Sequence, residues 1–195
     1  MRRMVGAFTV CLIGLVSAST ALACSRVLWV AGDGQVFVGR TNDWTGKVDS
    51  AFRVFPRGIE RVGAVAENPH QWTSKYGSVI LSGYDMGTHE GVNEKGLSVH
   101  VLFLAEVCDF GKRDPKREGI GIMQWAQYYL DNYATVAEAV EAQKTFQFQI
   151  EPLVLPNGAP TMLHVSLSDK TGDSAVIEYI AGKAEVHHDK RYSVM

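Results

Sequence analysis

The sequence contains little cysteine and no large excess of either charge, and both shortages exclude classes of protein. Three cysteines among 195 residues are too few for a disulfide-rich scaffold. Nineteen Lys and Arg against 21 Asp and Glu leave a formal net charge of −2. Nucleic acid, which requires a basic face, is therefore not an expected partner. Low-complexity tracts and internal repeats are also missing, so the composition is that of an ordinary globular domain.

Long uncharged apolar runs are likewise missing, except at the N-terminus. Residues 1–3 carry two arginines, residues 4–16 form an uncharged apolar run, and residues 21–23 read Ala-Leu-Ala. This order is typical of a signal peptide that is cleaved after Ala23. The apolar run is too short to span a bilayer comfortably, so an N-terminal membrane anchor fits less well. We predict an exported protein, periplasmic or secreted, whose mature chain begins at Cys24.

Cys24 itself allows three interpretations. A cysteine directly after a signal sequence can be the lipidated residue of a bacterial lipoprotein, although such signals favour Leu, Val or Ile where this chain has Ala21. Cys11 leaves with the signal peptide, so Cys24 and Cys108 are the remaining pair and can form one disulfide. The third interpretation is a free N-terminal thiol that is kept for chemistry. Cysteine counting alone does not separate these alternatives.

The start of the mature chain predicts a β-hairpin. An apolar run over residues 24–31 and another over residues 35–41 are separated by Gly32-Asp33-Gly34, a strong turn signal. Because a hairpin folds back on itself, the end of its second strand lies beside the start of its first. We therefore expect Arg40 and Asp43 to lie near Cys24.

The remainder of the chain reads as strands, then two helices, then strands. Helix 120–133 has apolar residues at helical spacing, and Thr135 with Glu138 forms a capping box that opens helix 136–144. This order favours an α+β fold with helices packed on an antiparallel sheet. The strands are expected at 78–82, 97–104, 162–167, 174–180 and 184–187.

Cys24 is a candidate nucleophile because cleavage after Ala23 would create a free α-amine on the same residue. A thiolate is a far better nucleophile than a thiol, so the thiol needs a base. An α-amine with a pKa of roughly 7.7–8.0 can act as that base near neutral pH. In this hypothesis Arg40 stabilises the thiolate by charge, and Asp43 accepts from the α-ammonium group and holds its orientation.

Several stretches together resemble the choloylglycine hydrolase family, the conjugated bile acid hydrolases and penicillin V acylases, within the N-terminal nucleophile hydrolases. The resemblance runs essentially from Cys24 to Met195, and the motifs are specific as a set. The stretches are Cys24-Ser25-Arg26, residues 39–44 (GRTNDW), residues 90–99 (EGVNEKGLSV) and residues 169–179 (DKTGDSAVIEY).

The resemblance implies a four-layer αββα fold and hydrolysis of a linear, non-peptide C–N amide bond without a cofactor. Cys24 would attack the carbonyl and form an acyl-enzyme that water cleaves. Phe103 falls where the family places an oxyanion-hole residue, often Asn or Tyr, and only its backbone N–H can donate. Trp44 would form a wall for an apolar acyl group of a small-molecule amide; a core aromatic at a strand end is an equal alternative.

Length is the main departure from the family. Family members are considerably longer and typically continue beyond the final Val-Met with Thr-Asn-Ser-Pro, whose Asn supplies another oxyanion donor. The resemblance thus implies that 24–195 is the N-terminal portion of a single domain, truncated at the C-terminus, and that its own activity is doubtful. The full-length form is a candidate homo-oligomer.

Other functions remain open at this stage. The chain is alternatively an inactive fragment, or a lipid-anchored or secreted binding protein whose Cys24 is modified; only lipidation would bring it to a membrane. If the chain is a hydrolase, the resemblance admits penicillin V, acyl-homoserine lactones and conjugated bile salts, and the export signal favours the first two. His187 and His188 with Asp189 lack a third ligand at a convincing spacing, so no metal site is predicted.

Overall fold

A computed structural model describes residues 24–44, 46–104, 107–154 and 160–189. The predicted signal peptide and residues 190–195 lie outside these ranges. Within them, the elements follow the expected order of strands, two helices and strands. None of the helices in the described ranges is both long and apolar enough to cross a membrane.

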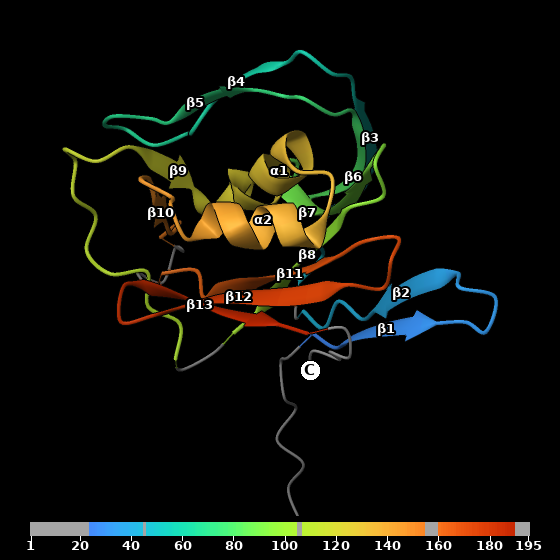
Figure 1. Cartoon of the computed structure of the whole chain (residues 1–195). Coiled ribbons are helices and arrows are strands. Elements are labelled where there is room, and N and C mark those ends of the chain that lie inside the picture. Colours follow the sequence, from blue (N-terminus) through green and yellow to red (C-terminus); the bar gives the residue numbers. More distant parts are fainter. Residues whose placement is uncertain (1–23, 45, 105–106, 155–159, 190–195) are drawn as a thin grey trace, which may run out of the picture.

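A seven-stranded antiparallel sheet forms the centre of the molecule, in the strand order β13-β12-β11-β8-β7-β6-β3 (Figure 1). Every neighbouring pair is antiparallel, so the sheet has the character predicted for an α+β fold. The strands are β3 (Ala51–Phe55), β6 (Ser78–Gly83), β7 (Gly87–Asn93), β8 (Ser98–Phe103), β11 (Leu163–Ser168), β12 (Ser174–Ile180) and β13 (Lys183–His188).

Two helices, α1 (Ile122–Asn132) and α2 (Val136–Gln143), cover one face of this sheet (Figure 1). The capping box that was predicted for α2 is present in part, because the Glu138 carboxylate reaches the N–H of Ala134 and not that of the N-cap residue Thr135. The Thr135 hydroxyl accepts from the Glu138 backbone N–H at 3.2 Å, and the Glu138 carboxylate accepts from the Ala134 N–H at 2.8 Å. Alternate residues of the central strands point toward the helices and bury their apolar side chains there, which supplies most of the hydrophobic stabilisation. This core includes Val99, Val101, Val165, Leu167, Ile177, Trp125, Tyr129 and Leu130.

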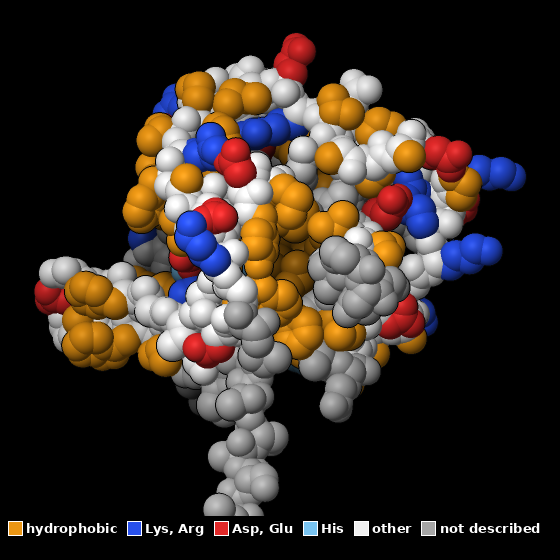
Figure 2. Space-filling view, turned by 180° about the vertical axis from the view of Figure 1, so that it is seen from behind, with side chains coloured by type: hydrophobic (Ala, Val, Ile, Leu, Met, Phe, Trp, Pro, Cys, Tyr) orange, Lys and Arg blue, Asp and Glu red, His pale blue; other side chains and the backbone are white. Residues whose placement is uncertain are grey.

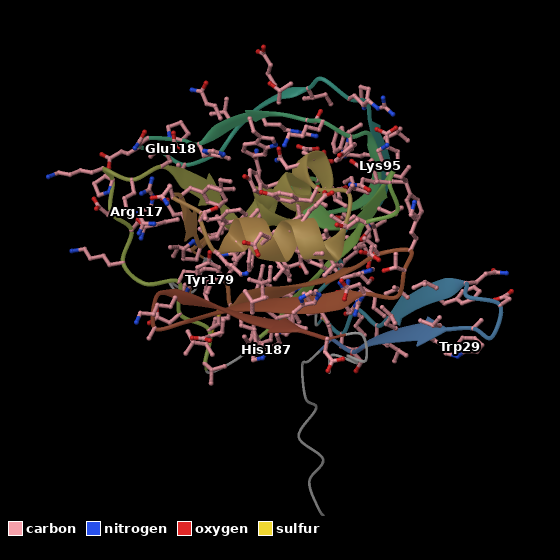
Figure 3. The ribbon with its side chains drawn as sticks, in the orientation of Figure 1. Trp29, Lys95, Arg117, Glu118, Tyr179 and His187 are labelled. Carbon is pink, nitrogen blue, oxygen red and sulfur yellow. The ribbon has the colours of Figure 1, made fainter. Side chains whose placement is uncertain are left out.

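The opposite face of the sheet carries the predicted hairpin, β1 (Arg26–Val30) and β2 (Val36–Arg40). Cys24, two residues before the start of β1, packs against Leu102 and Val176 of the sheet. The buried Arg26 guanidinium donates to the Ser168 hydroxyl at 2.6 Å. The far end of the hairpin projects from the body, where Trp29 lies away from the helices (Figure 3). The described chain thus stacks helices, sheet and hairpin.

Strands β3 and β7 of the sheet and two short strand pairs outside it were not predicted from the sequence. One pair is the antiparallel arm of β4 (Glu60–Val62) and β5 (Gln71–Thr73); the other is the parallel pair β9 (Gly119–Gly121) and β10 (Gln149–Glu151). Because residues 119–121 belong to β9, α1 begins at Ile122 and not at residue 120, as the periodicity had predicted.

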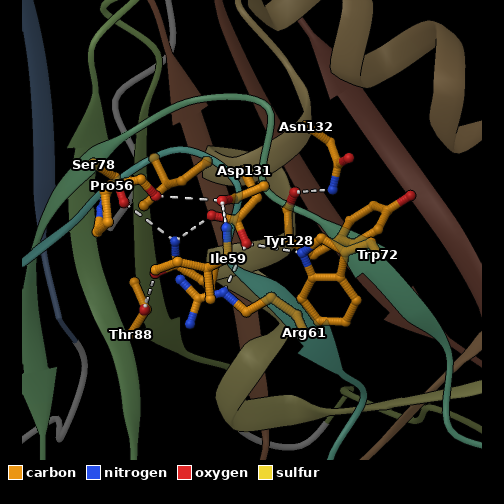
Figure 4. Close-up of polar contacts among 12 residues, drawn as sticks. Pro56, Ile59, Arg61, Trp72, Ser78, Thr88, Tyr128, Asp131 and Asn132 are labelled. Atoms are coloured by element: carbon orange, nitrogen blue, oxygen red, sulfur yellow. Dashed lines mark hydrogen bonds and ion pairs between the residues drawn. The ribbon is translucent and has the colours of Figure 1, made fainter.

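The arm is fastened to α1 by one buried carboxylate (Figure 4). Asp131 is fully buried and accepts from Arg61 Nε at 3.1 Å and from Trp72 Nε1 at 2.8 Å. Its other oxygen accepts from Gln127 Nε2 at 2.7 Å. Arg61 and Trp72 belong to β4 and β5, so these bonds hold the arm over the helix.

Candidate active site

Cys24 is buried, with 5% of its surface exposed. The next residue, Ser25, is hydrogen-bonded to Thr41, which directly follows β2. The Thr41 N–H donates to the Ser25 carbonyl at 2.9 Å, and the Ser25 N–H donates to the Thr41 hydroxyl at 3.0 Å. These reciprocal bonds extend the hairpin ladder by one step and confirm that the chain returns to Cys24. The Cys24 Sγ then lies 3.9 Å from Asn42 Oδ1.

Arg40 ends β2, and its side chain, 6% exposed, turns in under the hairpin. Nη1 donates to the Val101 carbonyl at 2.7 Å and Nε to the Thr41 carbonyl at 3.0 Å. Nη2 lies 3.5 Å from Asn42 Oδ1, the same oxygen that meets the Cys24 thiol. The structure therefore brings Arg40 into the surroundings of Cys24, with the Asn42 amide between them.

Glu90 supplies a counter-charge for Arg40 that was not predicted from the sequence. Its Oε2 lies 3.6 Å from Arg40 Nε and 3.2 Å from His100 Nδ1. The hydrogen bond from His100 lowers the pKa of Glu90, and the nearby charge of Arg40 lowers it further, although burial acts the other way. Burial is also the main reason that the pKa of His100 is lowered.

Asp43 lies just beyond the end of β2, one side chain away from the start of the hairpin. Its exposed carboxylate accepts from the Thr41 hydroxyl at 2.6 Å, and Thr41 in turn accepts from the Ser25 N–H. Asp43 is thereby connected to the start of β1 through Thr41, and its bond in the described structure goes to that hydroxyl. Its expected hold on the α-amine of Cys24 stays a prediction.

An apolar pocket of about 170 Å³ opens beside Cys24. Trp44 and Phe103, two of the predicted site residues, both line it, and their rings meet edge to face with centroids 5.9 Å apart. The space-filling view shows a hollow surrounded by hydrophobic side chains in the middle of one face (Figure 2). Other lining residues include Asn42, Val48, Tyr84, Met86, Thr88, His89, Val101, Ile122, Leu153, Thr161 and Leu163.

Cys24 and Cys108 are both free thiols in the described structure, which contradicts the disulfide alternative. Cys108 Sγ lies 3.6 Å from the Leu163 carbonyl, and partial burial raises the pKa of the Cys108 thiol. Within the described ranges, no group of three His, Cys, Asp or Glu side chains is placed to hold a metal ion. His188 Nε2 forms a hydrogen bond with the Asp173 carboxylate at 2.9 Å.

Fold and site together define an α+β sandwich of the N-terminal nucleophile hydrolase type, with a buried cysteine at the start of the first strand and an apolar pocket beside it. The chain belongs to the choloylglycine hydrolase family of linear amide C–N hydrolases, because the model of that family matches residues 24–195. The match begins at Cys24.

Individual relatives agree with this membership. The chain is 40% identical to a penicillin V acylase of Pectobacterium atrosepticum over 96% of this chain and 53% of the relative. It is 28% identical to a bile salt hydrolase/transferase of Clostridium perfringens over 84% of this chain and 50% of that protein. The structure of penicillin V acylase from Agrobacterium tumefaciens superposes with a TM-score of 0.80 at 46% identity, covering 88% of this chain and 51% of that one.

A variant of conjugated bile acid hydrolase from Clostridium perfringens superposes with a TM-score of 0.71 at 26% identity, covering 85% of this chain and 51% of that one. The chain thus spans about half the length of the relatives it matches.

Proposed function

We propose that this chain carries the nucleophile half of an exported amide hydrolase, in which Cys24 attacks a linear C–N amide of a small molecule with an apolar acyl group. The observation that carries the proposal is the placement of Cys24 Sγ beside an apolar pocket. The Arg40 guanidinium lies nearby, with the Asn42 side-chain amide between the two groups. Family membership supports the type of bond.

The proposed reaction has two stages. Cleavage after Ala23 frees the α-amine of Cys24, which takes the thiol proton as the sulfur attacks the carbonyl carbon. The carbonyl π pair moves to oxygen, returns as the C–N bond breaks, and the amine leaves with the proton. Water then attacks the thioester, which releases the acid and restores the thiol.

Each further site residue has a separate role in this proposal. The positive charge of Arg40 favours the thiolate over the thiol. Asp43 orients the α-amine, to which it is linked through Thr41 and the start of the first strand. Trp44 and the Phe103 ring bind the acyl group by apolar contact, while the backbone N–H of Phe103 is an oxyanion donor.

Export is part of the proposal, because the α-amine exists only once the predicted signal peptide has been removed. The protein would then be periplasmic or secreted. Penicillin V is the first substrate to test, since two relatives of 40% and 46% identity are penicillin V acylases. Acyl-homoserine lactones and conjugated bile salts also carry an apolar acyl group on an amide. They are the next substrates to test after penicillin V.

The test is the release of primary amine from these three substrates by the processed chain and by three variants. Cys24→Ser should abolish release while the protein stays folded, because a poorly activated hydroxyl replaces the thiol. A variant whose signal peptide cannot be cleaved should also be inactive. Cys108→Ser is the matched control and should keep the wild-type rate.

Near-normal turnover by Cys24→Ser, or full activity of the uncleaved form, would contradict the mechanism. A processed wild-type chain that releases no amine would contradict hydrolysis by this chain and favour the inactive-fragment alternative. An intact mass that shows a diacylglyceryl group on Cys24 would favour the lipid-anchored alternative.

A further inference from the structure

We propose that Asn42 is a further catalytic residue of this site, whose side-chain amide turns about its Cβ–Cγ bond and donates an N–H to the anion that forms as Cys24 reacts. This inference rests on the proposed function of Cys24. Asn42 is suited to the role because its side chain touches the sulfur, lines the substrate pocket and lies next to Arg40.

The contacts of the resting site define the first state of Asn42. Its Oδ1 lies 3.9 Å from the Cys24 sulfur and 3.5 Å from Arg40 Nη2. A carbonyl oxygen can accept from the thiol but cannot stabilise a thiolate. The observed orientation therefore fits the neutral thiol, and ionisation of the sulfur would place two electron-rich atoms against each other.

A half-turn of the amide resolves this conflict. The oxygen and nitrogen of an Asn amide are nearly equal in size, so the turn exchanges an acceptor for a two-hydrogen donor in the same space. The turn gives up the 3.5 Å contact with Arg40 Nη2, because two N–H donors would then face each other. Arg40 keeps its position without this contact, since the carbonyls of Val101 and Thr41 hold it at 2.7 and 3.0 Å. The backbone beside Asn42 is held by the bonds between Thr41 and Ser25.

The pocket has a need for such a donor. An oxyanion in a largely apolar pocket requires several N–H or O–H groups. Phe103 is proposed to supply its backbone N–H, but its side chain has no donor to add. Thr88 also lines the pocket, but its hydroxyl already donates to Gln127 Oε1 at 2.6 Å. Among the described side chains that line the pocket, Asn42 is the one whose polar atom is placed against the Cys24 sulfur.

In the proposed step, Asn42 donates a hydrogen bond while the proton moves between groups of Cys24. As the thiol proton moves to the α-amine, Asn42 Nδ2 donates to the sulfur anion. As the S–C bond forms, the negative charge moves to the carbonyl oxygen and the same N–H group follows it. Asn42 neither gains nor loses a proton. Other charged and titratable groups near Cys24 and Asn42 also influence the charge on the sulfur. They are Arg26, Arg40, Asp43, His89, Glu90 and His100.

The test measures the rate at which iodoacetamide alkylates Cys24 as a function of pH, by peptide mass mapping of the processed chain. If Asn42 donates to the thiolate, Asn42→Ala should move the midpoint of this profile to higher pH. Asn42→Asp, which keeps the shape but adds a negative charge, should move it further, by about one pH unit or more. Gln35→Ala, which removes an exposed side-chain amide at the turn of the hairpin, should leave the midpoint unchanged.

Turnover adds a second readout where the wild-type chain is active. Asn42→Ala should lower kcat by about 10²-fold with little change in KM, as for the loss of one oxyanion donor. A midpoint that stays in place or moves to lower pH in Asn42→Ala would overturn the proposal, since Asn42 would then be only an acceptor for the thiol. Alkylation does not require turnover, so these outcomes are separate from a failure of the proposed hydrolase activity.

Discussion

At the scale of the residue, the face of the sheet beneath the hairpin is unusual because it buries an imidazole without a hydrogen bond. His164 is 2% exposed, and neither of its ring nitrogens has a hydrogen-bond partner in the described structure. Nδ1 lies 3.5 Å from the Glu178 carboxylate, which is an ion-pair distance without hydrogen-bond geometry. Burial is the main reason that the pKa of His164 is lowered, so the folded protein holds the neutral ring.

This burial gives the stability of the protein a pH dependence of known sign. A histidine whose pKa is lower in the folded than in the unfolded chain binds its proton mainly in the unfolded state. The associated stability is present above the unfolded pKa of about 6.5 and is lost as the pH falls below it. His89 and His100, whose pKa values burial also lowers, act in the same direction.

We therefore expect the urea midpoint of residues 24–195 to fall between pH 7.5 and pH 5, and His164→Leu to reduce that fall. His187→Leu is the control, because His187 lies 3.4 Å from the same Glu178 but is half exposed. An unchanged pH dependence in His164→Leu, or an equal effect in the control, would show that the buried ring does not cause it.

Single residues of the site were partly predictable. A hairpin that starts at Cys24 returns its own end to the same place, so local sequence was enough to bring Arg40 into the site. Glu90 was not predictable in this way, because it reaches Arg40 only through the register of β7 against β8 and the seat of the hairpin on the sheet. Such contacts depend on the whole fold and leave no local pattern.

At the scale of the element, predictability followed the strength of the local pattern. The hairpin and both helices carry turn, cap or periodic signals and were found with shifts of one or two residues at their ends. β7 is polar and contains two glycines, and it is a strand because β6 and β8 pair with it on both sides. The three-residue strands of the arm are too short for any alternation to be visible.

The arm of β4 and β5 should depend on Asp131 for its position on α1. In Asp131→Asn, the charge that balances Arg61 is lost and the bonds to Arg61, Trp72 and Gln127 can no longer all be kept. Breaking a buried ion pair typically costs about 3–5 kcal/mol, so we expect a loss of about 3 kcal/mol in the free energy of unfolding, measured with urea.

The matched control is Glu60→Gln, which neutralises an exposed carboxylate on the same arm and should change stability by less than about 0.5 kcal/mol. If Asp131→Asn were as stable as the wild type, the buried carboxylate would not be what fastens the arm.

At the scale of the whole molecule, the described chain exposes an unusual amount of apolar side-chain surface on its strands. Phe52 and Val54 on the edge strand β3 are 82% and 75% exposed, and Trp29 on the hairpin is 63% exposed. Large exposed apolar surfaces and open sheet edges favour association. The chain also spans about half the length of its relatives, so the behaviour of residues 24–195 as a separate unit is itself open to measurement.

We expect purified 24–195 to self-associate as its concentration rises, as seen by light scattering after size-exclusion chromatography. Phe52→Lys combined with Val54→Lys should reduce the association, because charge on an edge strand opposes pairing. Val62→Lys changes an exposed residue on the separate arm and should have little effect. A wild-type unit that stays monomeric at high concentration would contradict this expectation.

The central claim is that Cys24 is the nucleophile, and the most direct measurement of it is the mass of the N-terminal peptide after brief incubation of the processed chain with penicillin V and an acid quench. The account predicts that the acyl group of the substrate is added to Cys24 and is absent from Cys108. Release of amine without any acyl group on Cys24, or an acyl group on a different residue, would contradict it.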